Sequence, residues 1–182
     1  MKTSLWRLLV VVAVLAAAPA AARAQQEARS DDFDFEFGEW TARVSRLVEP
    51  LSGSTKWVDY VGTSVVHKLW DGRGNIGELD VTGETGRIQG LSLRLYNPET
   101  GQWFISWANS RDGQLGPPMI GGFEDGVGTF YNQEMFNGRA VYVRFIFSDI
   151  RENSFRFEQA FSIDGGTTWE PNWIATFERT SR

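Results

Sequence analysis

The chain has 182 residues, of which 14% are aromatic, a formal net charge of −5 and no cysteine. This length fits one domain with a substantial core, and without cysteine that core cannot depend on disulfide bonds. The negative charge and the lack of any run of Lys or Arg argue against partners with a phosphate backbone, so we expect no nucleic-acid binding.

Residues 1–24 have the pattern of a secretory signal peptide. Two basic residues, Lys2 and Arg7, precede the apolar run LLVVVAVLAAAPAAA, and Ala-Arg-Ala at 22–24 matches a cleavage site. We therefore expect an exported, soluble protein, periplasmic or extracellular, with no integral membrane segment after cleavage. Cleavage would leave 158 residues and change the net charge from −5 to −8, because three basic residues leave with the signal.

The polar stretch QQEARSDD at 25–32 predicts a disordered linker, and residues 33–182 predict a single domain. Within that domain apolar and polar residues alternate with period two, as in half-buried strands whose apolar residues face a core, for example LSLRLY at 91–96. No segment has the apolar spacing of an amphipathic helix. Turn sequences separate the alternating segments, and Asn137-Gly138 is the strongest hairpin signal among them. About ten strands are predicted, near residues 38–48, 57–70, 74–81, 88–96, 102–109, 118–123, 127–136, 139–149, 153–163 and 172–180.

Short hairpins join the predicted strands almost throughout. This connectivity predicts an all-β fold, an antiparallel up-and-down β-barrel of about ten strands that closes on itself and so has no free edge. A two-sheet sandwich is the alternative, but it would need longer crossovers, and the chain has only two longer loops, at 49–56 and 110–118. The Gly- and Pro-rich stretch 111–126 either covers the open end of the barrel or is an irregular connection.

The stretch SIDGGTTW at 162–169 fits the Asp-box pattern of sialidases. A sialidase-type propeller needs several blades and repeats this pattern from blade to blade, whereas this chain has one copy and is too short. We interpret the stretch as a stabilised hairpin turn. Asp164 is expected to accept backbone hydrogen bonds, Gly166 to adopt a positive φ, and Trp169 to fold back over the hairpin.

Two motifs near the ends of the domain carry a family resemblance. FDFEFGEW at 33–40 and SIDGGTTWEPNWIATFERT at 162–180 resemble the DUF1579 family and similar lipocalin-like, calycin-type bacterial barrels. The resemblance covers nearly the whole domain and implies a lipocalin-like barrel. Gly38 and Trp40 match the Gly-x-Trp that opens the first lipocalin strand, which implies that Trp40 closes the barrel base with Arg179 packed across it. A ligand is implied only by analogy.

Aromatic side chains suggest what such a barrel could hold. Indole rings form an apolar wall with a polar tip, which suits a hydrophobic or aromatic ligand. Arg94 and Arg144 alternate with apolar residues, and they face either a polar lumen or solvent. The candidate ligand-binding residues are His67, Trp57, Trp103, Trp107, Trp173, Arg94 and Arg144. Small barrels can also be filled by side chains, and the chain would then be a structural or interaction domain.

His67 is the only histidine. With no cysteine beside it, zinc sites built from several His or Cys ligands are excluded, and we predict no metal site. If His67 faced the interior it could ligate a haem iron, as in the small haem-binding barrels called nitrobindins. Otherwise it is hydrogen-bonded to a neighbour or faces water.

We predict no catalytic residue and no cofactor. The predicted function is non-catalytic binding of a small apolar or aromatic molecule by an exported lipocalin-like barrel. The first alternative is an enzyme, a hydrolase or isomerase, that uses the barrel mouth. The second alternative is a haem-binding barrel that uses His67.

Overall fold

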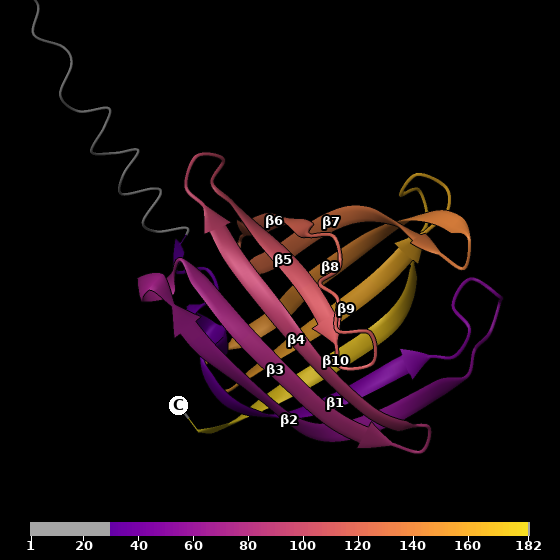
Figure 1. Cartoon of the computed structure of the whole chain (residues 1–182), viewed down its shortest axis with the longest axis horizontal. Coiled ribbons are helices and arrows are strands. Elements are labelled where there is room, and N and C mark those ends of the chain that lie inside the picture. Colours follow the sequence, from indigo (N-terminus) through magenta and orange to yellow (C-terminus); the bar gives the residue numbers. More distant parts are fainter. Residues whose placement is uncertain (1–29, 182) are drawn as a thin grey trace, which may run out of the picture.

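The computed structural model describes residues 30–181, which form a closed barrel of ten antiparallel strands (Figure 1). Two short 3-10 helices, η1 (Asp34–Glu36) and η2 (Trp70–Gly72), precede the first and third strands. Each strand pairs with its chain neighbours, and β1 pairs with β10 to close the barrel, so the predicted up-and-down barrel is confirmed. The strands are β1 (Gly38–Leu47), β2 (Trp57–Leu69), β3 (Gly74–Gly83), β4 (Gly86–Asn97), β5 (Gln102–Asn109), β6 (Met119–Glu124), β7 (Val127–Phe136), β8 (Arg139–Arg151), β9 (Ser154–Ser162) and β10 (Glu170–Ser181).

The strand ends lie close to the predicted positions because turn residues mark them. Between β7 and β8 the two loop residues are Asn137 and Gly138, with φ of 49° and 78°. Between β6 and β7 they are Asp125 and Gly126, with φ of 50° and 77°. Two successive positive φ angles are what the tightest hairpin turn requires, and Asn, Asp and Gly tolerate them best.

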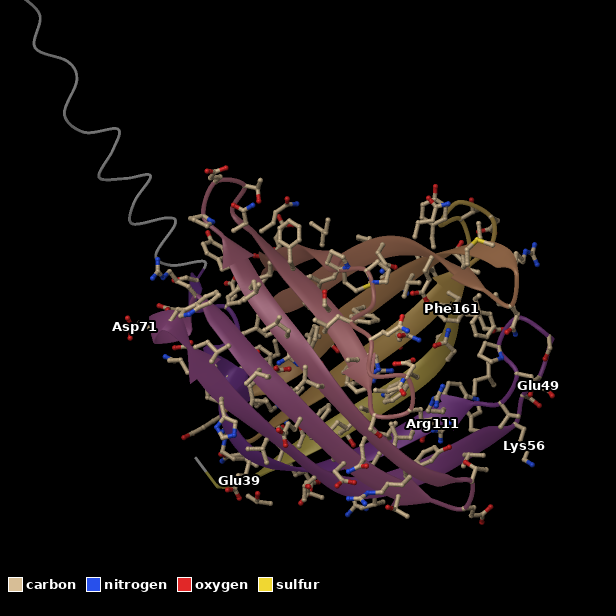
Figure 2. The ribbon with its side chains drawn as sticks, in the orientation of Figure 1. Glu39, Glu49, Lys56, Asp71, Arg111 and Phe161 are labelled. Atoms are coloured by element: carbon tan, nitrogen blue, oxygen red, sulfur yellow. The ribbon has the colours of Figure 1, made fainter. Side chains whose placement is uncertain are left out.

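One end of the barrel, which we call the base, is closed by the residues before β1. In Figure 2 this end carries Glu39 and Asp71. The ring of Phe33 is fully buried and packs edge to face on Trp103 and Phe123, with centroids 5.0 Å and 4.9 Å apart. The base is therefore an aromatic plug that the N-terminal segment inserts between the strand ends.

An arginine of the last strand holds this plug in place. The guanidinium of Arg179 lies 4.0 Å from the centre of the Trp40 ring. It also donates hydrogen bonds to the carbonyls of Phe35 and Phe37, on either side of Glu36. At the start of β1, Gly38 has a φ of 111°, which only glycine adopts readily. The first and last strands are thus joined through the Trp40 and Arg179 side chains as well as through their backbones.

The lead-in to the barrel begins with a turn. The backbone N–H of Asp34 donates to the carbonyl of Asp31 at 2.9 Å, so residues 31–34 form a turn that leads into η1. The rest of the predicted linker, 25–29, and the predicted signal peptide, 1–24, lie outside the described residues.

The opposite end, which we call the mouth, carries Glu49 and Lys56 (Figure 2). Part of the interior near the mouth is filled by a second apolar cluster from the first four strands and β10. Its buried members are Ala42, Val44, Val58, Tyr60, Leu79, Val81, Ile88 and Ala175. This cluster therefore packs the interior on the side of β1–β4 and β10.

Strand β4 shows that apolar alternation alone does not identify the inner face. The leucines of LSLRLY lie partly exposed on the outside, whereas Arg94 and Tyr96 are buried and point inward. Outside, two of the leucines lie opposite Ile76 and Phe104 on the neighbouring strands. Inside, Arg94 meets Glu36 of η1, a partner that the pattern of β4 does not reveal. The expectation that the apolar residues of each strand face the core is therefore wrong for β4.

Candidate ligand-binding cavity

A cavity of about 230 Å³ lies inside the barrel, above the base. Its volume is just below the roughly 300–1,000 Å³ of most ligand sites, so only a small molecule would fit it. The apolar wall consists of Leu79, Ile105, Trp107, Met119, Val143, Phe145, Phe147, Phe155, Phe157, Trp173 and Phe177. The polar residues along it are Glu36, Ser64, Glu78, Ser92, Arg94, Asn132, Glu134 and Gln159.

The floor of the cavity is a buried ion pair between η1 and β4. Glu36 Oε2 lies 2.7 Å from Arg94 Nη1, and the two side chains are only 1% and 9% exposed. The same Nη1 donates a hydrogen bond to Asn75 Oδ1 at 2.8 Å. The guanidinium also lies 5.1 Å from the centre of the Phe33 ring. Gly77 keeps this space open, because a Cβ there would lie 3.2 Å from Arg94 Nη1.

Burial acts on both members of this pair. It raises the pKa of the Glu36 carboxyl and lowers the pKa of the Arg94 guanidinium, and their mutual attraction opposes both changes. The ionised pair has no net charge, so the floor is polar but neutral. Arg94 Nε has no hydrogen-bond partner among the described residues, which leaves one unused donor at the floor.

Two tryptophans form the wall toward the mouth. The rings of Trp107 and Trp173 meet edge to face, with centroids 6.1 Å apart. Trp107 lies against the backbone of β4 at Gly90, where a Cβ would be 1.9 Å from its Cζ2 atom. Arg46 lies 4.8 Å from the centre of the Trp173 ring, and burial lowers the pKa of this arginine. Both indoles are thus held by neighbours, which makes this part of the wall rigid.

The wall contributed by β7 is polar. Asn132 Nδ2 donates to the carbonyl of Pro117 at 3.3 Å, and its Oδ1 has no hydrogen-bond partner within residues 30–181. Two residues further on the same face, Glu134 is partly buried and makes no hydrogen bond or ion pair with any described residue. Burial raises the pKa of the Glu134 carboxyl, and no nearby charge opposes the effect. This wall therefore offers acceptors that the protein itself does not use.

The loop 110–118 closes the side of the cavity where strand pairing is incomplete. β5 and β6 share only three residue pairs, between Trp103–Ile105 and Met119–Gly121. Beyond them the loop runs beside β5, and the N–H of Gly116 donates to the carbonyl of Trp107 at 2.8 Å. Gly116 and Pro117 both line the cavity. The Gly- and Pro-rich stretch thus forms part of the side wall.

Of the seven candidate ligand-binding residues, three line the cavity, namely Arg94, Trp107 and Trp173. Trp103 is fully buried, but it belongs to the base cluster around Phe33 and does not line the cavity. The buried strand tryptophans therefore have different roles, because Trp107 and Trp173 form the cavity wall whereas Trp103 belongs to the plug.

The other three candidates lie on the outer face and cannot contact a ligand in this cavity. His67 is exposed, and the residue before it, Val66, is buried inside the barrel. Trp57, at the start of the same strand, faces outward by the same alternation and is 37% exposed. Arg144 lies outside the barrel, 4.6 Å from the centre of the Trp169 ring. The prediction that these three side chains contact a ligand inside the barrel is therefore wrong. The even-numbered residues of β2 and the odd-numbered residues of β8 are the ones that point inward.

The Asp-box stretch forms the turn between β9 and β10. Asp164 accepts hydrogen bonds from Thr168 N at 2.9 Å, from Thr168 Oγ1 at 2.6 Å and from Ser162 Oγ at 2.8 Å. These bonds lower the pKa of Asp164 to about 2. Gly166 has a φ of 88°, and its Cα faces the ring of Trp169, which a Cβ would approach to 3.3 Å. None of these residues lines the cavity, so their contacts stabilise the hairpin turn rather than a binding site.

Four polar residues that line the cavity were not predicted from the sequence, namely Glu36, Asn132, Glu134 and Gln159. For β7 a signal was present, because Asn132 and Glu134 interrupt the apolar face that Phe130 and Phe136 begin and end. Glu36 carried no such signal, since its role depends on a partner 58 positions away in the sequence.

The fold and the cavity together define the class of protein, a lipocalin-like β-barrel with an internal cavity. No protein-family model matches the sequence, and no curated protein matches it. Among the described residues no helix is long and apolar enough to cross a membrane. Nor do residues 30–181 hold three or more Asp, Glu or His side chains in an arrangement that could bind a metal ion.

Comparison with solved structures finds three that resemble this chain at low identity. An S-type phycobiliprotein lyase from Guillardia theta has a TM-score of 0.58 at 10% identity, over 88% of this chain and 98% of its own. A fluorescence-activating β-barrel designed de novo has a TM-score of 0.44 at 12% identity, over 82% and 98%. EF1p2_mFAP2b bound to DFHBI has a TM-score of 0.45 at 9% identity, over 84% and 99%. At 10% identity the likeness to the lyase shows the fold alone.

Proposed function

We propose that this chain binds a small apolar or aromatic molecule inside the barrel and does not convert it. The observation that carries the proposal is the internal cavity of about 230 Å³, which has a mainly aromatic wall and a polar floor. Such sites combine apolar area, which supplies affinity, with a few polar groups, which fix orientation. Here the indoles of Trp107 and Trp173 supply rigid area, and Arg94 Nε is an unused donor at the floor.

Binding without conversion is supported by two ionisable side chains that are not available for catalysis in the cavity. Glu36 is held in its ion pair with Arg94, which leaves it no free role as a base. The lone histidine, His67, is on the outer face, so a ligand in the cavity meets no imidazole. For the same reason a haem bound through His67 would lie outside the barrel rather than in the cavity.

We also propose that the chain is exported and related to the DUF1579-like barrels. Export is supported by the signal-peptide pattern of residues 1–24, and the relationship by the motifs at 33–40 and 162–180.

Filling the cavity tests the binding proposal. Ser92 lines the cavity, whereas Ser106 lies on the outer face of the neighbouring strand, opposite a leucine of β4. We expect Ser92→Leu to weaken the binding of the fluorescent apolar probe N-phenyl-1-naphthylamine by about tenfold or more, since it removes about 1.4 kcal/mol or more of binding free energy. Ser106→Leu should leave the dissociation constant unchanged. Thermal unfolding of both variants verifies that they are folded, and equal probe binding by wild type and Ser92→Leu would contradict the proposal.

Native mass spectrometry of the protein from the exported fraction of its own host would identify the natural ligand. A stoichiometric added mass that disappears in Ser92→Leu supports binding in the cavity. If the protein carries no added mass and also fails to bind the probe, the barrel acts through its surface.

A further inference from the structure

Glu134 points into the cavity from β7. It lies opposite Val141 of β8, which is fully buried inside the barrel, and directly paired residues of a sheet point to the same face. Glu134 itself lines the cavity and is partly buried. Its carboxylate is therefore presented to whatever occupies the interior.

The charge of Glu134 is not compensated by the protein. At the floor, Glu36 and Arg94 neutralise each other. Glu78 also borders the cavity, but its side chain is exposed, and alternation between Gly77 and Leu79 places it on the outer face. Among the described residues, the ionisable side chains that line the cavity and point into it thus sum to one negative charge, which is on β7. Arg46 lies against Trp173 nearer the mouth and does not line the cavity.

A partly buried carboxylate that has no hydrogen-bond or ion-pair partner lowers the stability of the folded protein, unless a bound ligand provides that partner. Burial raises the pKa of Glu134, which is the signature of that cost. The nearby Asn132 Oδ1 is a second acceptor without a donor among the described residues. Two unused acceptors on one wall select for a ligand that carries hydrogen-bond donors, and a negative charge among them selects for a cation.

We propose that Glu134 binds the protonated amine of the ligand, so that the natural ligand is a small aromatic or apolar amine. The ammonium group would donate a charge-assisted hydrogen bond to the Glu134 carboxylate, while its apolar body lies against Trp107 and Trp173. An acidic ligand is disfavoured, because Glu134 would repel it and Arg94 is already paired with Glu36. This inference rests on the proposed function, since it names the ligand class of the same cavity.

Three probes of one shape and different charge test the ligand class, namely 2-phenylethylamine, 2-phenylethanol and phenylacetate. Isothermal titration calorimetry at pH 7 should show that wild type binds the amine more tightly than the alcohol, and the acid most weakly. Glu134→Gln should weaken amine binding about ten- to a hundredfold, as expected for loss of a hydrogen bond between two charged groups. It should leave alcohol binding unchanged. Glu178→Gln, which removes an exposed charge from β10, is the matched control and should alter none of the three.

Thermal unfolding without ligand gives a second readout. Because Glu134→Gln removes a desolvated charge, its midpoint should equal or exceed that of wild type. A clearly lower midpoint would mean that Glu134 has a structural contact, and the proposal would fail. Equal affinity for amine and alcohol in both wild type and Glu134→Gln would overturn the amine class while leaving the cavity as a binding site. If none of the three probes binds, the cavity is not a site for small aromatic ligands. Both the binding proposal and the amine proposal would then be wrong.

Discussion

Glu36 and Arg94 occupy positions that neither could hold alone. Each is almost completely removed from water, where an unpaired charge is costly, and each reduces that cost for the other. The pair also joins η1 to β4, so it fixes the plug of the base against the barrel wall. At the other end of the cavity, Glu134 has no such partner, and this difference is why one carboxylate is structural and the other is available to a ligand.

Removing one member of the pair should cost more than removing both. Arg94→Met leaves Glu36 buried and unpaired, and we expect it to lower the free energy of unfolding by about 3–5 kcal/mol at pH 7. Glu36→Gln combined with Arg94→Met should lower it by less, because no charge is then left in the interior. Urea unfolding of the single and double variants measures both values, and a double variant less stable than Arg94→Met would count against this account.

The loss in Arg94→Met should also depend on pH. Without the guanidinium, burial alone acts on Glu36 and holds its pKa in the folded protein above its usual 4.5. The folded state then binds a proton more readily than the unfolded state, so its stability increases as the pH falls toward 4.5. The difference from wild type should therefore be smaller at pH 5 than at pH 7, and a constant difference would show that Glu36 does not titrate in this way.

At the scale of single elements, short-range chemistry sets the strands and turns. Alternation and turn residues act over two to five positions, and for this reason all ten strands lie near their predicted ranges. The same signals indicated the wrong inner face for β4 and left the place of His67 open. Which face is inner depends on how the whole sheet closes, and on β4 the apolar face lies outside.

The turn between β9 and β10 offers a test at this scale. Hydrogen bonds to Thr168 and Ser162 lower the pKa of Asp164 from its usual 3.8 to about 2. A carboxyl with a depressed pKa stabilises the folded state fully above 3.8, and that contribution is lost as the pH falls toward 2. We expect Asp164→Asn to lower the thermal midpoint at pH 7 and to flatten the decline in stability between pH 4 and pH 2. Asp125→Asn, in the turn between β6 and β7, is the control and should keep the wild-type decline.

At the scale of the whole molecule, the barrel is closed at its base by contacts between the first and last strands. Arg179 lies over Trp40 and donates hydrogen bonds to backbone carbonyls before β1 and, at Glu152, in the hairpin between β8 and β9. One side chain thus ties together three segments that are distant in sequence. The cavity needs this closure, because η1 carries the Glu36 that forms its floor.

Loss of Arg179 should therefore affect the entire barrel. Arg179→Met removes the contact with the Trp40 ring and several hydrogen bonds, and we expect it to lower the free energy of unfolding by about 2–4 kcal/mol. Arg179→Lys should recover little, since an ammonium group cannot reproduce the planar set of donors. Arg43→Met, which changes an exposed arginine on the outer face of β1, is the control for urea unfolding. A loss no larger than that of the control would mean that closure does not depend on Arg179.

The sequence by itself determined the class of fold, the number of strands and their approximate ends. It also indicated the aromatic residues from which the cavity wall is drawn, because these properties depend on neighbours along the chain. Only the tertiary structure decided that Trp107, Trp173 and Arg94 meet around a cavity while His67 and Arg144 lie outside. It alone brought Glu36 to Arg94 and left Glu134 without a partner. The physical reason is that the energy of a charge depends on what surrounds it in space, and strand register and barrel closure set those surroundings.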